Sequence, residues 1–132
     1  MRMNLPLNAL AVAALLLAGC ATPPDPAPAP PPAPEKPANT ISATDCLWLD
    51  SSVGTFAAYA DAGDLGMVVV NLRGISTDSA RFATNYSGKA SSALRGLSTA
   101  ASSYADAIES GDFAGAGDDF VRHSGAINDL CQ

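Results

Sequence analysis

Hydrophobic side chains recur every three or four positions through most of the chain after residue 40. Such spacing places them on one face of an α-helix, and that face is buried against other helices. The pattern predicts four helices. Their apolar stripes are Cys46, Leu49, Val53, Phe56 and Ala60; Leu65, Val68, Leu72, Ile75, Ser79, Phe82 and Tyr86; Ala90, Leu94, Leu97, Ala101, Tyr104 and Ile108; and Phe113, Ala116, Phe120, Ile127 and Cys131.

Two of the connections between these stripes have the same chemistry. Gly63 is followed by Asp64, and Gly111 is followed by Asp112. A glycine in the left-handed conformation ends one helix, and the aspartate caps the next. Such tight turns join antiparallel neighbours, so the sequence predicts an all-α, up-down-up-down four-helix bundle over residues 40–132.

Some local features leave alternatives open. Either Thr44 or Asp45 can cap the first helix. Residues 66–72 contain a run of valines bounded by glycine, which also suits a strand, although the sequence shows no second strand to pair with it. The polar residues 76–78 could divide the second helix into two shorter ones.

The amino terminus has the features of an export signal. A short, positively charged head precedes an apolar run, and small residues follow that run, as in secretory signal peptides. The run closes on Leu17-Ala18-Gly19-Cys20, which resembles the lipobox of bacterial lipoproteins. The resemblance implies a signal peptide over residues 1–19, cleavage between Gly19 and Cys20, and a diacylglycerol thioether on Cys20.

Two other interpretations of this segment compete with a lipoprotein signal. One is a plain signal peptide, and the other is an uncleaved membrane helix, which needs about 20 apolar residues and therefore a longer run than this one. By the resemblance, Ala21 after the cysteine implies the outer membrane in a host that has one. Otherwise the anchor is expected on the outer face of the cell membrane.

Residues 20–39 comprise the cysteine and a proline-rich linker that holds nine of the ten prolines of the chain. Proline lacks the amide donor and fixes φ, so this segment is expected to be disordered and polyproline-like, rising about 3.1 Å per residue. We expect a stalk that separates the helical domain from the membrane. The alternative is a docking peptide for a proline-binding module.

With Cys20 lipidated, Cys46 and Cys131 remain. The exported compartment is oxidising, so this pair predicts a disulfide. An up-down-up-down bundle also starts and ends at the same end, which places both cysteines there. Two free buried thiols are the alternative. A zinc site is not expected, because two isolated cysteines lack the paired spacing of zinc ligands.

The net charge of −6 argues against nucleic-acid binding and against adhesion to anionic lipids. His123 is the sole histidine, and the chain has no motif for a catalytic serine, a di-iron centre or a calcium loop. Met67 could pair with His123 on haem, but no Cys-x-x-Cys-His motif accompanies them. We expect no enzymatic activity, catalytic residue, metal or cofactor.

An exposed apolar patch is the remaining functional signal. Met67, Val69 and Val70 belong to a run that one helical face cannot hide, and Trp48 lies off the first helix's stripe. The layout is similar to small helical lipoproteins of high-GC bacteria. We expect a lipid-anchored envelope protein with a structural or protein-interaction role. The alternative is a carrier or sensor of a small apolar ligand, such as a lipid or haem, held between helices.

Overall fold

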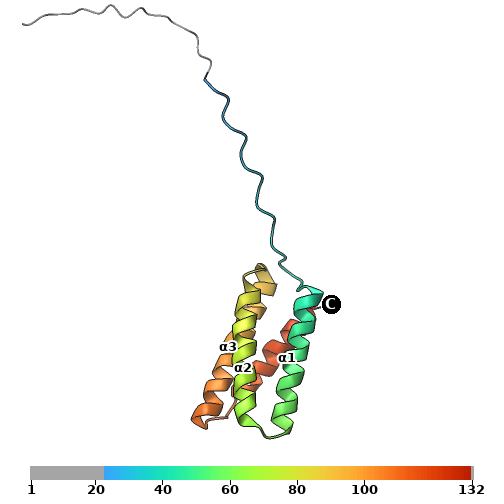
Figure 1. The fold of residues 1–132 in the computed structure, drawn as a ribbon, viewed down its shortest axis with the longest axis vertical. Helices are drawn as coiled ribbons and strands as arrows, with labels where there is room; N and C mark the ends of the chain where they lie inside the picture. Colours follow the sequence, from blue (N-terminus) through green and yellow to red (C-terminus); the bar gives the residue numbers. More distant parts are fainter. Residues whose placement is uncertain (1–22, 132) are drawn as a thin grey trace, which may run out of the picture. The chain divides into compact units, whose positions relative to one another are not determined.

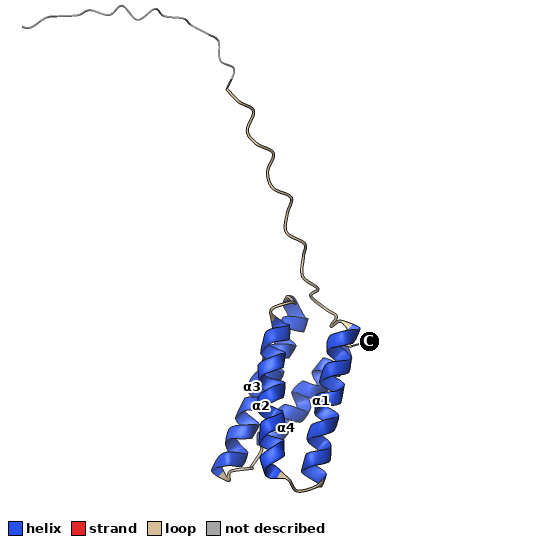
Figure 2. Cartoon of the chain, in the orientation of Figure 1, coloured by secondary structure: helices blue, strands red, loops and turns tan. Residues whose placement is uncertain are grey.

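The computed structural model describes residues 23–131, so the predicted signal peptide, Gly19 and Cys20 lie outside it. The described chain forms four helices, α1 (Ala43–Asp61), α2 (Leu65–Ala83), α3 (Gly88–Ser110) and α4 (Ala116–Leu130) (Figure 1). Successive helices run in opposite directions, and residues 23–131 contain no strand (Figure 2). The predicted all-α four-helix bundle is therefore confirmed.

The chain divides into two units, Met1–Pro32 and Ala33–Gln132. In the first unit, residues 23–32 are exposed and have neither helix nor strand, as the proline content predicts. All four helices belong to the second unit. That unit has its own hydrophobic core.

The core lies between α2, α3 and α4, and α1 covers one side of it. Leu72 and Ile75 of α2 belong to the same buried cluster as Leu94 and Leu97 of α3. Alanines along α3 let the neighbouring helices approach closely, because a methyl group fills little space. Leu49 is the one buried residue that α1 supplies.

The α1–α2 connection follows the predicted chemistry. Gly63 is left-handed with φ of 71°, and the Asp64 carboxylate accepts a hydrogen bond from the Met67 amide at 3.1 Å, which confirms Asp64 as the cap. The start of α1 differs from the prediction. Ser42 is the cap, and its hydroxyl accepts from the Asp45 amide at 3.2 Å, so neither Thr44 nor Asp45 caps α1.

The α3–α4 connection is longer than predicted. Gly111 ends α3 in the left-handed conformation as expected, with φ of 76°. Asp112 does not cap α4, because its amide donates to the Ala107 carbonyl at 2.9 Å and so completes the end of α3. Gly115 is also left-handed, with φ of 77°, and α4 begins only after it. The predicted start of the fourth helix at Asp112 is therefore wrong.

Both alternatives for the second helix are excluded by the structure. The valine run lies inside α2, where Val68 and Leu72 are buried at helical spacing. The polar residues 76–78 do not interrupt α2. The Thr77 hydroxyl donates to the Arg73 carbonyl at 3.0 Å, and the Ser76 hydroxyl lies 3.3 Å from that of Ser98, so these polar groups are satisfied within a continuous helix.

Cys46 and Cys131 form a disulfide, with 5.8 Å between their α-carbons, which confirms the predicted pair. The bond joins the start of α1 to the residue that ends α4. A backbone hydrogen bond of 2.9 Å from the Ile41 amide to the Leu130 carbonyl lies beside it. The first and last helices are thus tied together at one end of the bundle.

The last residues of the predicted linker pack onto the helical unit. The Pro37 carbonyl accepts from the Ser87 amide at 2.9 Å, and the Ala38 carbonyl accepts from the Ala90 amide at 2.8 Å. Ser87 makes no side-chain cap, so these carbonyls satisfy amides that the start of α3 leaves free. We call this end of the bundle, with the α2–α3 turn and the disulfide, the proximal end.

Candidate functional site

The predicted patch residues on α2 are near its start. Val70 is 62% exposed and Met67 is 37% exposed, while Val69 is half-buried and packs against the core. Met67 and Val70 are three positions apart, so they lie on the same side of the helix. The two side chains together form a small apolar surface on α2.

Trp48 does not belong to that surface. Its ring is half-buried and packs edge-on against Phe82, with 5.3 Å between ring centroids. Phe82 follows Val70 by twelve positions on α2, which is about 18 Å of helix. The structure therefore separates Trp48 from Met67 and Val70, and Trp48 joins α1 to α2.

Two further apolar side chains are exposed at the end of the bundle formed by the α1–α2 turn and the α3–α4 loop. We call it the distal end, and it lies opposite the proximal end (Figure 1). Leu65 and Phe113 are each 50% exposed there. The periodicity assigns both to buried stripes, and this is wrong: Leu65 is the first residue of α2, and Phe113 lies in the loop before α4.

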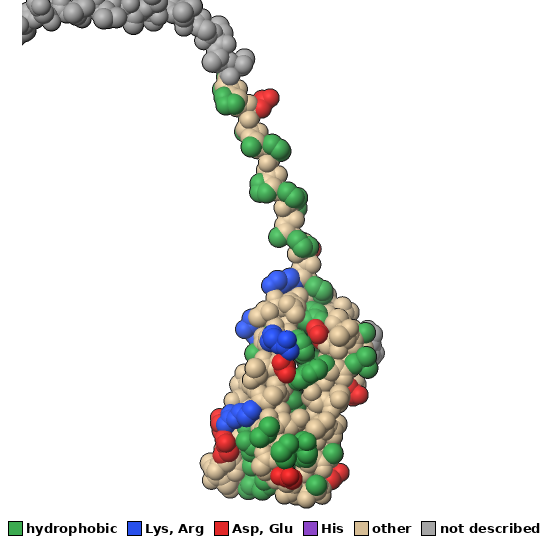
Figure 3. Space-filling view, in the orientation of Figure 1, with side chains coloured by type: hydrophobic (Ala, Val, Ile, Leu, Met, Phe, Trp, Pro, Cys, Tyr) green, Lys and Arg blue, Asp and Glu red, His purple; other side chains and the backbone are tan. Residues whose placement is uncertain are grey.

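The distal end also carries carboxylates. Asp61, Asp64 and Asp112 flank the two connections and are exposed. Figure 3 shows hydrophobic side chains beside acidic ones toward this end. We call the set of exposed side chains Leu65, Met67, Val70 and Phe113 the distal apolar residues. Their acidic surroundings complement a basic surface.

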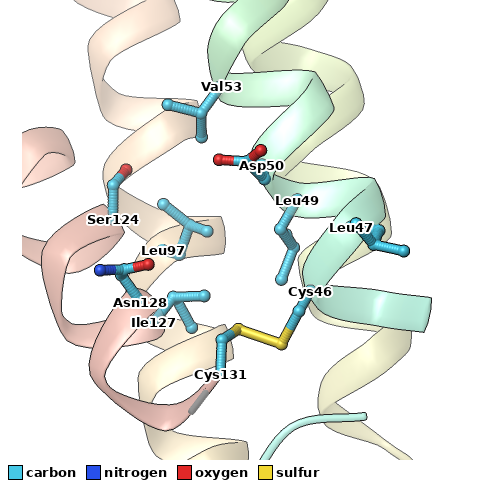
Figure 4. Close-up of a pocket in the computed structure, with 10 residues that line it drawn as sticks. All are labelled: Cys46, Leu47, Leu49, Asp50, Val53, Leu97, Ser124, Ile127, Asn128 and Cys131. Atoms are coloured by element: carbon cyan, nitrogen blue, oxygen red, sulfur yellow. A yellow bond between two sulfur atoms is a disulfide. The ribbon is translucent and has the colours of Figure 1, made fainter. Parts of the chain in front are cut away.

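A pocket of about 340 Å³ opens between α1 and α4 (Figure 4). At one end it is closed by the Cys46–Cys131 disulfide. Beyond its other end Phe56 of α1 packs on Phe120 of α4, with 5.0 Å between ring centroids. Between these two ties the helices do not close on each other, and the pocket occupies the space.

The pocket has an apolar floor and polar walls. Leu49, Leu97 and Ile127 are buried and form the floor. Asp50 on α1 and Asn128 on α4 line opposite walls of the pocket (Figure 4). Such a combination of apolar floor and few polar groups is typical of small-ligand sites, and sequence reasoning missed it because the pairing of the two helix faces is not visible in one helix's periodicity.

The ion pairs of the helical unit lie away from this pocket. Arg73 pairs with Asp106 and Glu109, and these two hydrogen-bonded partners raise the pKa of Arg73. The two remaining pairs join neighbours within one helix, Arg81 with Asp78 and Arg122 with Asp119. Among residues 23–131, no ion pair involves Asp50.

His123 lies on the side of α4 that faces α3. Its imidazole packs over Gly96 of α3, where an added β-carbon would approach the ring to 2.5 Å. Arg95, Asp119 and His123 are among the residues that line a second pocket of about 350 Å³ between α3 and α4. Met67 is exposed at the start of α2, whereas His123 packs between α3 and α4. The structure therefore does not bring together Met67 and His123, the pair considered for haem.

Within the described part of the chain, no group of three or more His, Cys, Asp or Glu side chains is arranged to hold a metal ion. None of the four helices combines the length and apolar character that crossing a membrane requires. No protein-family model, curated protein or solved structure matches this chain.

Proposed function

We propose that this chain is an exported, lipid-anchored protein of the cell envelope whose helical unit makes a non-enzymatic contact with another envelope protein. The anchor part of the proposal rests on Leu17-Ala18-Gly19-Cys20, which resembles a lipobox. The contact part rests on the distal apolar residues. Four large apolar side chains exposed at one end are more than isolated surface hydrophobics, and such groups mark interaction sites.

The position of these residues supports a contact made away from the anchor. The chain joins the helical unit at the proximal end, where Pro37 and Ala38 hydrogen-bond to the start of α3. The distal apolar residues lie at the opposite end of the same unit. An acyl anchor on Cys20 would therefore leave them free to meet a partner.

The charge of the distal end indicates what that partner presents. Asp61, Asp64 and Asp112 are exposed among the distal apolar residues. A complementary surface would offer apolar side chains with lysine or arginine at its rim, because charge complementarity at a rim sets partner choice and association rate. The conclusion that the geometry supports best is a docking module for a basic, partly apolar protein surface.

Site-directed photocrosslinking in intact cells tests this function. A photoreactive residue at Val70 should give one discrete crosslinked product. The matched control is Ala80, which is also exposed on α2 but lies ten positions nearer the proximal end. Val70→Lys should abolish a crosslink formed from Met67, since the added charge repels a basic partner, whereas Ala80→Lys should leave it intact.

Equal crosslinking from Val70 and Ala80, or none from Val70, would contradict the proposed contact. The anchor is tested separately by Cys20→Ala, which should leave an unprocessed precursor and should remove detergent-phase partitioning. Normal cleavage before residue 20 in that variant would contradict lipidation.

A further inference from the structure

The space between α1 and α4 follows from the side chains that the two helices turn toward each other. In an antiparallel bundle, such a seam is normally filled by large apolar residues from both helices. Here Leu49 of α1 and Ile127 of α4 lie at the floor, and above them α1 contributes Asp50 and Val53 while α4 contributes Ser124 and Asn128. These side chains are short or polar, so they leave about 340 Å³ open above a floor of buried leucine and isoleucine.

The polar groups at the opening are not arranged to satisfy one another. The Ser124 hydroxyl donates to the Phe120 carbonyl at 2.9 Å, so its proton is committed to the helix backbone. Asp50 is directed toward the opening (Figure 4) and takes part in none of the ion pairs of residues 23–131. The pocket therefore presents an anionic acceptor beside an apolar floor.

We propose that this pocket binds a small amphipathic cation, which has a compact apolar body and one ammonium group. The apolar body would lie against Leu49, Leu97 and Ile127. The ammonium would donate to the Asp50 carboxylate and to the side-chain carbonyl of Asn128 on the opposite wall. The site is separate from the distal apolar residues and goes beyond the proposed protein contact.

Size and charge together select this chemistry. About 340 Å³ is near the lower limit of roughly 300–1,000 Å³ for ligand pockets, so a single ring with a short chain fits and a larger cofactor does not. A carboxylate ligand would meet the like charge of Asp50, which is unfavourable. A wholly apolar ligand would cover Asp50 without giving it a donor, which costs the hydration of that carboxylate.

The test uses the full mature chain in phosphatidylcholine nanodiscs with labelled leucine and isoleucine methyl groups. The probes are 4-phenylbutylamine and 4-phenylbutyrate, which have the same apolar body and opposite charge. The amine should shift the methyl signals of Leu49, Leu97 and Ile127. It should also bind more tightly than the carboxylate, by up to about fivefold, as expected for a partly solvated ion pair.

Asp50→Asn should remove this preference and leave the two probes binding about equally. Asp61→Asn is the matched control, because it makes the same charge change at an exposed position of α1 near the distal end. It should keep the preference. The proposal is overturned if millimolar amine leaves the three methyl signals unmoved, if wild-type protein binds both probes equally, or if Asp50→Asn keeps the preference.

Discussion

The α2–α3 interface and the α1–α4 seam are built from different side chains. In the first, Leu72 and Ile75 of α2 and Leu94 and Leu97 of α3 belong to one hydrophobic cluster, and all four are buried. Across the second, Leu49 of α1 and Ile127 of α4 are buried, but the side chains around them leave a pocket of about 340 Å³. The second seam is held mainly at two places, by the Cys46–Cys131 disulfide and by the Phe56–Phe120 contact.

This difference separates two ways of closing a bundle. Buried leucine and isoleucine hold α2 and α3 together through the area that they remove from water. A covalent bond holds α1 to α4 at one point and needs no packing along the seam. The seam can therefore keep an open pocket without opening the bundle, and stability and ligand space are assigned to different interfaces.

The largest expected effect comes from removing the covalent tie. Cys46 and Cys131 are 85 residues apart, so their bond should contribute about 4–5 kcal/mol in the chain-entropy account. The double variant Cys46→Ser, Cys131→Ser should lose that much free energy of unfolding in urea denaturation. A loss below about 1 kcal/mol would show that packing alone holds α1 on α4.

A core truncation should have the next largest effect. Leu72→Ala removes a fully buried side chain from the α2–α3 interface and should cost about 2–5 kcal/mol in the same measurement. The control is Leu47→Ala on α1, where the side chain is 71% exposed and the change should stay within about 0.5 kcal/mol. Similar losses in the two variants would remove the contrast between the interfaces.

Two glycine substitutions compare the close contact between α3 and α4 with the open surface of α1. At Gly54 an added β-carbon meets nothing within 4 Å, so Gly54→Ala should raise stability by up to about 1 kcal/mol through helix propensity. At Gly96 the β-carbon would lie 2.5 Å from the His123 ring, so Gly96→Ala should destabilise by about 1 kcal/mol.

A double-mutant cycle checks the reason for that loss. With His123→Ala present, the ring that blocks the β-carbon is gone, and Gly96→Ala should then become stabilising. If Gly96→Ala costs the same with and without His123, the loss does not come from this contact.

The smallest effect is expected at the α2–α3 surface. Arg73 pairs with Asp106 and Glu109 at exposed positions, and such pairs add little to stability. Arg73→Met should lower the thermal unfolding temperature less than any destabilising substitution above, and 1 M NaCl should reduce the difference because salt screens the pairs. A salt-independent loss would mean that the side chain acts through packing.

Much of the fold could be predicted because local chemistry and global arrangement agree. The stripes of α2 and α3 have clear three- and four-residue spacing, and Asp64 caps α2 as its position after Gly63 indicates. The cysteine pair and the even number of helices support each other. Each of these features depends on residues close in sequence or on a single possible pairing.

The features that could not be predicted depend on neighbours in space. Gly111 and Asp112 repeat the pattern of Gly63 and Asp64, yet the left-handed Gly115 delays the start of α4. Leu65 fits a buried stripe by spacing but is 50% exposed at the first position of α2. The α1–α4 pocket lies where side chains of two helices and of Leu97 on α3 meet, and spacing within one helix does not show which faces meet.

Hydrogen exchange of the full chain, with the disulfide intact and after reduction, tests most directly the claim that the covalent tie holds the proximal part of the α1–α4 seam, where the helices leave a pocket between them. On reduction, amides of residues 43–50 and 124–130 should lose the most protection. Amides in the middle of α2 and α3 should stay the best protected, because buried leucine and isoleucine hold them. If reduction lowers protection equally in all four helices, or leaves the seam protected, the account is contradicted.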